Sequence, residues 1–179
     1  YTVSHKKVVK VLPVSEHMAI TTAGLVSDIQ LFTKIIKAQL MLLKMRRGKE
    51  PTAKEAPNML ANLSYNNIRR PSMVPGIVGF LLGAWDKTGG HLFEIGVDGS
   101  LMEADDYATD GSGSRIVLGV LETLYKKDMT IEEGKELAIK SLKAAMSRDI
   151  ATGNGIDILV INAKGLEYID QKEVKTLVK

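Results

Sequence analysis

The amino-acid sequence predicts an α+β fold in which helices and antiparallel strands form separate layers. The predicted elements come in blocks, in the order strands, two helices, strands, two helices, strands, whereas a parallel α/β sheet needs alternation of the two. Turn signals at 86–90 and 98–99 separate short apolar runs, as in an antiparallel meander. The 179 residues, 45% of them hydrophobic, are enough for one core. A chain of this length buries about 70% of its unfolded surface.

The first strands are expected within residues 6–22, where apolar and polar side chains alternate loosely. This pattern predicts two short strands, with a break at Pro13 and a turn near Ser15 and Glu16. Ala23-Gly24 then ends the second strand.

Two helices are predicted next. Ser27 or Asp28 is expected to cap the first helix, which runs to about Arg47 and stops at Gly48. The second helix is expected from residue 52 or 53 to about 68, because a proline at position 71 prevents its continuation.

The second half of the chain repeats the pattern of strands followed by helices. Strands are predicted at residues 77–85, 91–95 and 101–103. A helix is expected from Ser114 to about Tyr125, and Thr130 and Glu133 have the spacing of a capping box that opens a helix reaching Ser147. The last predicted elements are strands at 156–162 and 166–169 and a short helix after 171.

Composition excludes several function classes. Without cysteine the chain forms no disulfide and no thiolate metal site. The net charge of +3 raises the possibility of nucleic-acid binding, but aromatic residues make up only 5% and are not interleaved with the basic ones. The longest uncharged apolar stretch, 74–85, is shorter than the roughly 20 residues of a membrane helix. We therefore expect no nucleic-acid and no membrane partner.

The three histidines, His5, His17 and His91, lack the spacing of a metal site, and no carboxylate cluster accompanies them in the sequence. They are expected to be surface or turn residues. We therefore expect no metal and no cofactor.

Two glycine-containing segments, 107–114 and 147–157, combine hydroxyl or carboxylate side chains with flexible backbone. Taken alone, the first is a turn in which Ser112 or Ser114 caps a helix, and Asp149 forms an ordinary helix-end ion pair with Arg148. Thr152 and the glycine after it would only mark the end of a helix. An anion cradle is disfavoured because a nucleotide-loop lysine is lacking.

Both segments resemble the two signature stretches of proteasome β-type subunits. The stretches 5–11, 21–28, 119–122 and 129–134 resemble the same family in the same order and at similar spacing, so the resemblance covers nearly the whole chain. It implies the four-layer αββα sandwich of the N-terminal-nucleophile hydrolases. It also implies that residues 1–179 form a single domain that lacks about two dozen N-terminal residues of the family.

The resemblance further implies a threonine endopeptidase site. The threonine nucleophile would precede Tyr1, so the sequence as given is expected to be inactive. Lys10 matches the lysine beside the nucleophile, where an ammonium favours the deprotonated hydroxyl. Gly24 matches the residue whose amide stabilises the oxyanion. Ser112, Asp149 and Thr152 match the network that supports the threonine amine.

Four residues match the family's pocket for the side chain before the scissile bond: Val8, Leu12, Thr22 and Val26. They predict a modest apolar pocket for small or medium hydrophobic side chains. Two departures from the family pattern concern the site itself: Thr152 stands where serine is usual, and Asp110 where threonine is usual.

The family assembles in stacked sevenfold rings, with β-type rings inside and α-type rings outside. The resemblance therefore implies β-type and α-type subunits, an ATP-driven unfoldase and unfolded proteins as partners, and a cytoplasmic location. An alternative is a non-catalytic β-type subunit that only supports the ring. Lys10 favours the catalytic role, and Asp110 favours the structural one.

Overall fold

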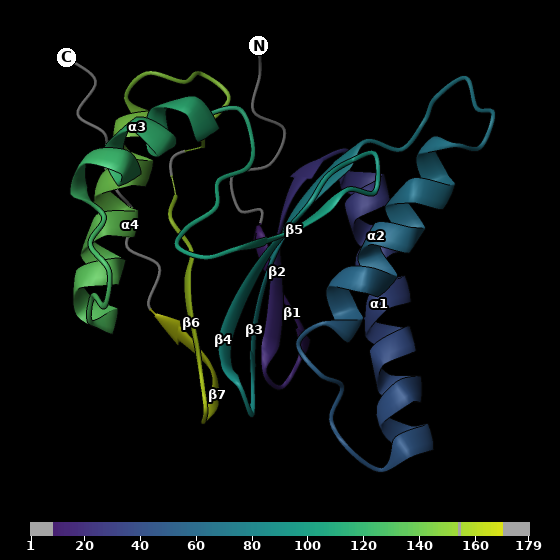
Figure 1. Ribbon diagram of the computed structural model, residues 1–179. Coiled ribbons are helices and arrows are strands. Elements are labelled where there is room, and N and C mark those ends of the chain that lie inside the picture. Colours follow the sequence, from purple (N-terminus) through teal and green to yellow (C-terminus); the bar gives the residue numbers. More distant parts are fainter. Residues whose placement is uncertain (1–8, 154, 170–179) are drawn as a thin grey trace.

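The computed structural model describes residues 9–153 and 155–169. Four layers lie side by side in Figure 1: helices α1 (Val26–Arg47) and α2 (Glu55–Ile68), a five-stranded sheet, a two-stranded sheet, and helices α3 (Ser114–Leu124) and α4 (Ile131–Met146). The predicted αββα order is therefore confirmed. Most of the stretch 5–11 that resembles the family, and the helix predicted after 171, lie outside the described residues.

The larger sheet is an antiparallel meander. Its strands are β1 (Val11–Ser15), β2 (Met18–Gly24), β3 (Val78–Asp86), β4 (Gly89–Ile95) and β5 (Leu101–Ala104), and they pair in sequence order. Strands β6 (Ile158–Asn162) and β7 (Gly165–Ile169) pair with each other in the second sheet. The predicted strands after residue 76 are confirmed, with ends that differ by one or two residues.

The predicted break at Pro13 lies inside a strand. β1 continues through Pro13, and the pairing with β2 shifts register between Pro13 and Ser15. Proline has no N–H to give to a ladder, and β1 is an edge strand where such an irregularity is tolerated.

The predicted cap of α1 is wrong. Leu25, with extended backbone at φ −73° and ψ 131°, is the N-cap residue, and no side chain caps this helix. Ser27 and Asp28 lie within its first turn instead. The helix begins early because Gly24 turns the chain at a positive φ of 148° and the Leu25 N–H donates to the carbonyl of Ile77 over 3.3 Å.

The capping box predicted for α4 is confirmed. The Thr130 hydroxyl accepts a hydrogen bond from the Glu133 N–H, and the Glu133 carboxylate accepts one from the Thr130 N–H at 2.8 Å. Such a box satisfies two backbone donors that the first helical turn leaves without partners.

The main core lies between the larger sheet and helices α1 and α2. Its fully buried side chains include Ile36, Leu40, Leu60, Phe80 and Leu82. On the opposite face of β3, a Cβ atom at Gly83 would lie 2.9 Å from Cδ1 of Ile161 in β6. The two sheets therefore approach closely where β3 carries no side chain.

No helix within the described part of the chain is long and apolar enough to cross a membrane.

Candidate active site

Three residues singled out in the sequence meet in what we call the carboxylate cluster: Ser112, Asp149 and Thr152. The Ser112 and Thr152 hydroxyls both donate to Oδ2 of Asp149, each at 2.5 Å. The backbone N–H of Ala151 donates to Oδ1 of the same carboxylate at 3.3 Å. The network expected from the resemblance therefore has the geometry of a connected unit.

Two neighbouring helices position this cluster. Ser112 lies two residues before α3, and Asp149 lies three residues after α4, so both come from helix ends that pack together. A Cβ atom at Gly113 would lie 2.8 Å from Oγ1 of Thr152 and 2.9 Å from Cβ of Ala145. Only glycine at position 113 lets the start of α3 come this close to the end of α4.

The Asp149 carboxyl is held in its ionised form. The hydrogen bond from Ser112, and then that from Thr152, lower its pKa below the ordinary value, against the opposing effect of partial desolvation. Within residues 9–153 and 155–169 no ion pair joins Asp149 to Arg148, which is exposed. The simple helix-end ion pair considered from the sequence is thus replaced by two hydroxyl donors.

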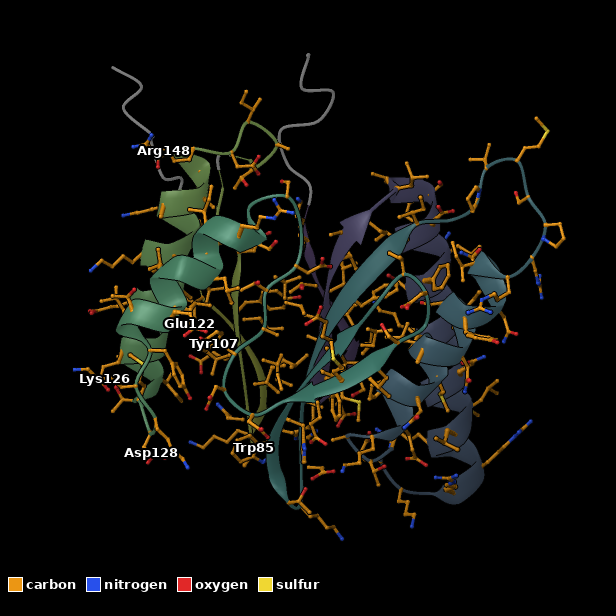
Figure 2. All side chains as sticks on the ribbon, turned by 45° about the horizontal axis from the view of Figure 1, so that its top comes forward. Trp85, Tyr107, Glu122, Lys126, Asp128 and Arg148 are labelled. Carbon is orange, nitrogen blue, oxygen red and sulfur yellow. The ribbon has the colours of Figure 1, made fainter. Side chains whose placement is uncertain are left out.

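The segment that carries Ser112 is fixed along its length. Ahead of it, Tyr107 and Tyr125 pack edge to face with ring centres 5.1 Å apart, and the Tyr125 hydroxyl donates to Asp106 over 3.3 Å. Figure 2 shows Tyr107 beside Glu122 of α3, and their hydrogen bond raises the pKa of the Tyr107 hydroxyl. These contacts hold the residues that precede the Ser112 loop against helix α3.

The same segment also lies against the larger sheet. Oδ2 of Asp110 is 2.6 Å from where a Cβ atom would stand on Gly79 in β3, and Gly111 approaches Cβ of Ala23 in β2. Because Gly24 follows Ala23, the carboxylate cluster and Gly24 lie at the same end of the sheet. This end, where β2 finishes and α1 begins, is at the top of Figure 1; we call it the site end.

Gly24 itself has no room for a side chain. A Cβ atom there would stand 2.1 Å from the carbonyl oxygen of Ile77 and 2.9 Å from Cα of Val78, and φ is +148°. Its backbone therefore follows a path that only glycine takes without strain.

Lys10 lies just before β1, next to Val11, which is opposite Thr21 of β2. Its backbone N–H is 3.5 Å from Oδ2 of Asp157, a residue that precedes β6, so this point joins the two sheets. No hydrogen bond or ion pair links the Lys10 ammonium to the carboxylate cluster in the described part of the chain. The role of Lys10 therefore stays a prediction.

The predicted substrate pocket is only partly described, because Val8 lies outside the described residues. Leu12 packs against the helix-side core, Thr22 is buried with 7% of its surface exposed, and Val26 is 58% exposed. Leu12 lies opposite Ile20, Thr22 lies two residues before Gly24, and Val26 opens α1. None of the three lines the hollow beside Trp85 and His91 or the one beside Glu16 and Lys44. The pocket also stays a prediction.

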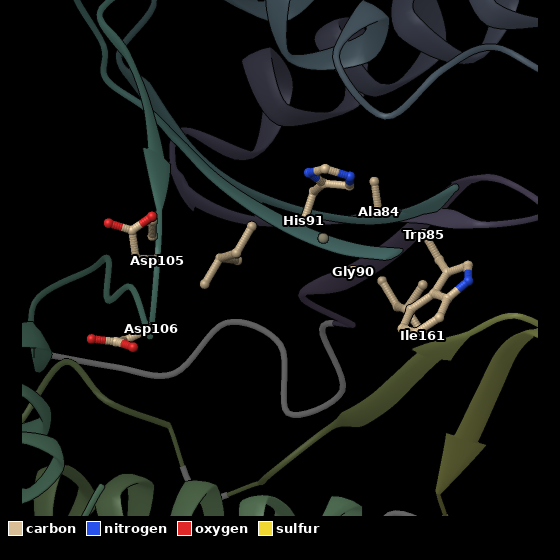
Figure 3. A pocket seen from close by; sticks show the side chains of 10 residues that line it. Ala84, Trp85, Gly90, His91, Asp105, Asp106 and Ile161 are labelled. Carbon is tan, nitrogen blue, oxygen red and sulfur yellow. The ribbon is translucent and has the colours of Figure 1, made fainter. Parts of the chain in front are cut away.

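One hollow of about 270 Å³ lies between β3, β4, the end of β5 and β6 (Figure 3). Its wall includes Trp85, His91, Asp105, Asp106 and Ile161. None of the predicted site residues contributes to it. It lies toward the β3–β4 hairpin, at the end of the strands opposite Gly24.

The sequence shows no carboxylate cluster beside the histidines, but the fold brings two carboxylates to His91. Its Nδ1 is 2.8 Å from Oε1 of Glu103, and its Nε2 is 3.4 Å from Oδ1 of Asp86 and 2.8 Å from the Thr88 hydroxyl. We call Asp86, Thr88, His91 and Glu103 the hairpin network. The sequence hides it because Glu103 is 12 residues from His91 and meets it only through the pairing of β4 with β5.

No group of three or more histidine, aspartate or glutamate side chains in the described residues is arranged to hold a metal ion.

Comparison with known proteins shows which family has this architecture and these residues. A family model described as "Proteasome subunit" matches residues 1–161. The chain belongs to the proteasome β-type subunit family. A proteasome subunit beta from Ferroglobus placidus is 34% identical over 99% of this chain and 82% of its own length. The proteasome subunit beta of Methanococcus aeolicus is 37% identical over 98% of this chain and 79% of its own.

A third relative, the proteasome subunit beta of Methanothrix thermoacetophila, is 35% identical over 95% of this chain and 80% of its own length. Such similarity over almost the whole chain supports a β-type proteasome subunit of archaeal type. It also supports assembly with other proteasome subunits.

Proposed function

We propose that this chain, in its mature form, is a threonine-type endopeptidase subunit of a proteasome core particle that degrades unfolded proteins inside a ring chamber in the cytoplasm. The observation that carries the proposal is the carboxylate cluster. Asp149 binds two hydroxyls from different loops, beside the end of β2 that carries Gly24. This arrangement fits a network that orients a terminal amine and its hydroxyl.

The chemistry proposed for this site starts with a threonine hydroxyl oxygen attacking the substrate carbonyl carbon while its proton passes to the terminal amine. The Lys10 ammonium favours the deprotonated hydroxyl and lowers the pKa of that amine. The Gly24 N–H donates a hydrogen bond to the oxyanion and stabilises it. The C–N bond then breaks, the leaving amine takes the proton, and water hydrolyses the ester.

Replacement of Lys10 tests this proposal. Lys10→Ala should abolish hydrolysis of an apolar peptide while ring assembly stays intact, because an exposed lysine contributes charge and not packing. Lys87→Ala, at an exposed position in the β3–β4 turn, is the matched control and should retain full turnover. Unchanged turnover in Lys10→Ala would remove Lys10 from the site.

The pocket prediction has its own test. Val26→Ala should enlarge the pocket and shift cleavage toward bulkier side chains, measured with a peptide series that varies the residue before the scissile bond. The absence of any shift would remove Val26 from the pocket.

A second candidate function is a non-catalytic β-type subunit within the ring. The observation that favours it is Asp110, whose carboxylate lies against Gly79 close to the cluster. Intact mass and N-terminal sequencing of the purified chain separate the two roles. A first residue of threonine, about two dozen positions before Tyr1, supports the protease. A first residue of Tyr1 supports the structural role.

The proposed partners follow from the family. They are further β-type subunits in a sevenfold ring, an α-type ring, an ATP-driven unfoldase and unfolded protein substrates.

A further inference from the structure

A row of exposed apolar side chains runs from the candidate site to a projecting loop. We call it the apolar strip, and its members are Leu25, Val26, Ile77, Val74 and Met73. Met73 is 101% exposed and Val74 is 76% exposed, so the far end of the strip stands clear of the rest of the molecule. The loop after α2 that carries both projects at the site end in Figure 1.

The strip is continuous with the candidate site through backbone contacts. The Leu25 N–H donates to the Ile77 carbonyl, and the same carbonyl lies against Gly24. Val26 belongs both to the strip and to the predicted pocket. The Asp28 carboxyl and the Asn67 amide lie against Gly76, between Val74 and Ile77, so a polypeptide that runs from the site to the projecting loop passes one polar step.

Two prolines and two local hydrogen bonds restrict the backbone at the tip of the loop. Pro71 and Pro75 restrict the backbone on either side of it. The Ser72 hydroxyl donates to the Val74 carbonyl at 3.0 Å and accepts from the Val74 N–H at 3.2 Å. A surface that is already ordered loses less entropy on binding than a mobile loop would.

Charge borders the loop on one side. The Arg69 guanidinium lies 4.6 Å above the centre of the Tyr65 ring, and Arg70 beside it is exposed. Arg69 and Arg70 thus place two cations at the base of the loop, with the Asp98 carboxylate close enough to interact with Arg69, and the tip of the loop is apolar. A partner that matches both features carries hydrophobic side chains next to acidic ones.

We propose that the apolar strip binds an extended hydrophobic segment of an unfolded polypeptide whose neighbouring residue is cleaved in the site. The proposal rests on the proposed function, since it extends the site along its substrate. The continuity with Gly24 and Val26 favours a substrate chain over another subunit as occupant. A linear row of side chains suits an extended chain, which presents alternate side chains to one surface.

The test compares a long substrate with a short one. Met73→Ser combined with Val74→Ser should lower the ratio of β-casein degradation to cleavage of a fluorogenic tripeptide by about tenfold, as expected from the loss of two buried apolar contacts. Val97→Ser with Met102→Ser, exposed positions in and near β5, is the matched control and should leave that ratio unchanged. An unchanged ratio in the loop variant would overturn the proposal.

Two further measurements separate this proposal from its alternatives. Fluorescence anisotropy of labelled β-casein, measured with the Lys10→Ala chain, reports binding without cleavage and keeps the test valid if the protease assignment fails. Weaker binding by the loop variant supports the strip, and equal binding overturns it. Sedimentation velocity reports assembly, and a loop variant that no longer assembles would make the strip a subunit contact and overturn the proposal.

Discussion

The two ends of the larger sheet carry similar chemistry in different architecture. At the site end, Asp149 accepts hydrogen bonds from two hydroxyls, and at the other end Asp86 accepts two from Thr88. Both carboxyls have lowered pKa values, and in each case a hydroxyl donor is the largest cause. A hydrogen-bonded carboxylate with a lowered pKa is therefore not by itself a sign of catalysis.

The difference lies in where the partners come from. The hairpin network joins the adjacent strands β3, β4 and β5. Asp86 also accepts a hydrogen bond from the N–H of Ala53 ahead of α2, so the network holds the start of this helix to the sheet. The carboxylate cluster joins two helix ends across Gly113, and the loop that carries Ser112 also lies against β3 at Gly79. Convergence of separate loops is what distinguishes a candidate active site from a structural network.

The strongest test of the difference between the two ends is to neutralise one carboxylate at each end of the sheet. Asp149→Asn should lower kcat/KM for a short peptide by about 100-fold, since displaced hydroxyls no longer orient the reacting groups. Asp86→Asn should leave kcat/KM within about twofold, because its partners in the described residues, Ala53, Thr88 and His91, lie outside the site. Steady-state kinetics measures kcat/KM for both variants, and circular dichroism verifies that they are folded. An equal loss of activity in both would contradict the distinction between the carboxylate cluster and the hairpin network.

Substitution of one glycine at each end of the sheet should show how much unfolding free energy is lost to backbone strain alone and how much to strain combined with steric overlap. Gly24→Ala is expected to lower the free energy of unfolding by about 3 kcal/mol, because a positive φ combines with overlap on the Ile77 carbonyl. Gly89→Ala, in the hairpin turn, has a φ of +119° but no atom within 4 Å, and should cost only about 1 kcal/mol. Urea denaturation measures both, and equal losses would show that overlap at Gly24 is relieved.

Acid should weaken the hairpin end through Asp86. Its folded pKa is lowered, chiefly by the Thr88 hydroxyl, so folding favours the ionised form and the associated stability is present above the unfolded pKa of about 3.9. That stability is lost as the pH falls below this value. Asp86→Asn should therefore flatten the fall in unfolding free energy between pH 5 and pH 3, measured by urea denaturation at each pH. An unchanged slope would assign the acid sensitivity to other carboxyls.

The smallest effect is expected in α4, which runs from the hairpin side to the site end in Figure 1. Thr130→Ala removes the capping hydroxyl at its start and should cost about 1 kcal/mol. Thr123→Ala in the last turn of α3 also removes a hydroxyl that is hydrogen-bonded to the backbone, but this hydroxyl caps no N–H group, and the change should be nearly neutral. Thermal unfolding measures the stability of both variants. If the Thr130 variant is as stable as the Thr123 variant, the capping box does not contribute to the stability of α4.

Local signals predicted most of the fold. The Thr130–Glu133 spacing and the glycine after α1 act over a few residues, and both predictions are confirmed. The start of α1 was predicted wrongly because it depends on a contact between Leu25 and Ile77, which are far apart in the sequence. A long-range contact of this kind leaves no periodic pattern.

The candidate site was predictable only through the family resemblance. Ser112, Asp149 and Thr152 taken singly match a turn and a helix end, and their contact across Gly113 is set by helix packing. The hairpin network was missed for the same reason, since strand pairing brings Glu103 to His91.

The position of Asp149 near the end of the chain has a consequence for synthesis. A ribosome makes Gly24 and the first sheet early, but the acceptor that unites Ser112 with Thr152 is added only after α4 is complete. Domains fold from the N-terminus as they emerge, at roughly 5–20 residues per second. A nascent chain therefore spends several seconds with all five strands of the larger sheet synthesised and the cluster incomplete. Under the proposed function, an unfinished subunit cannot cleave its neighbours on the same polysome.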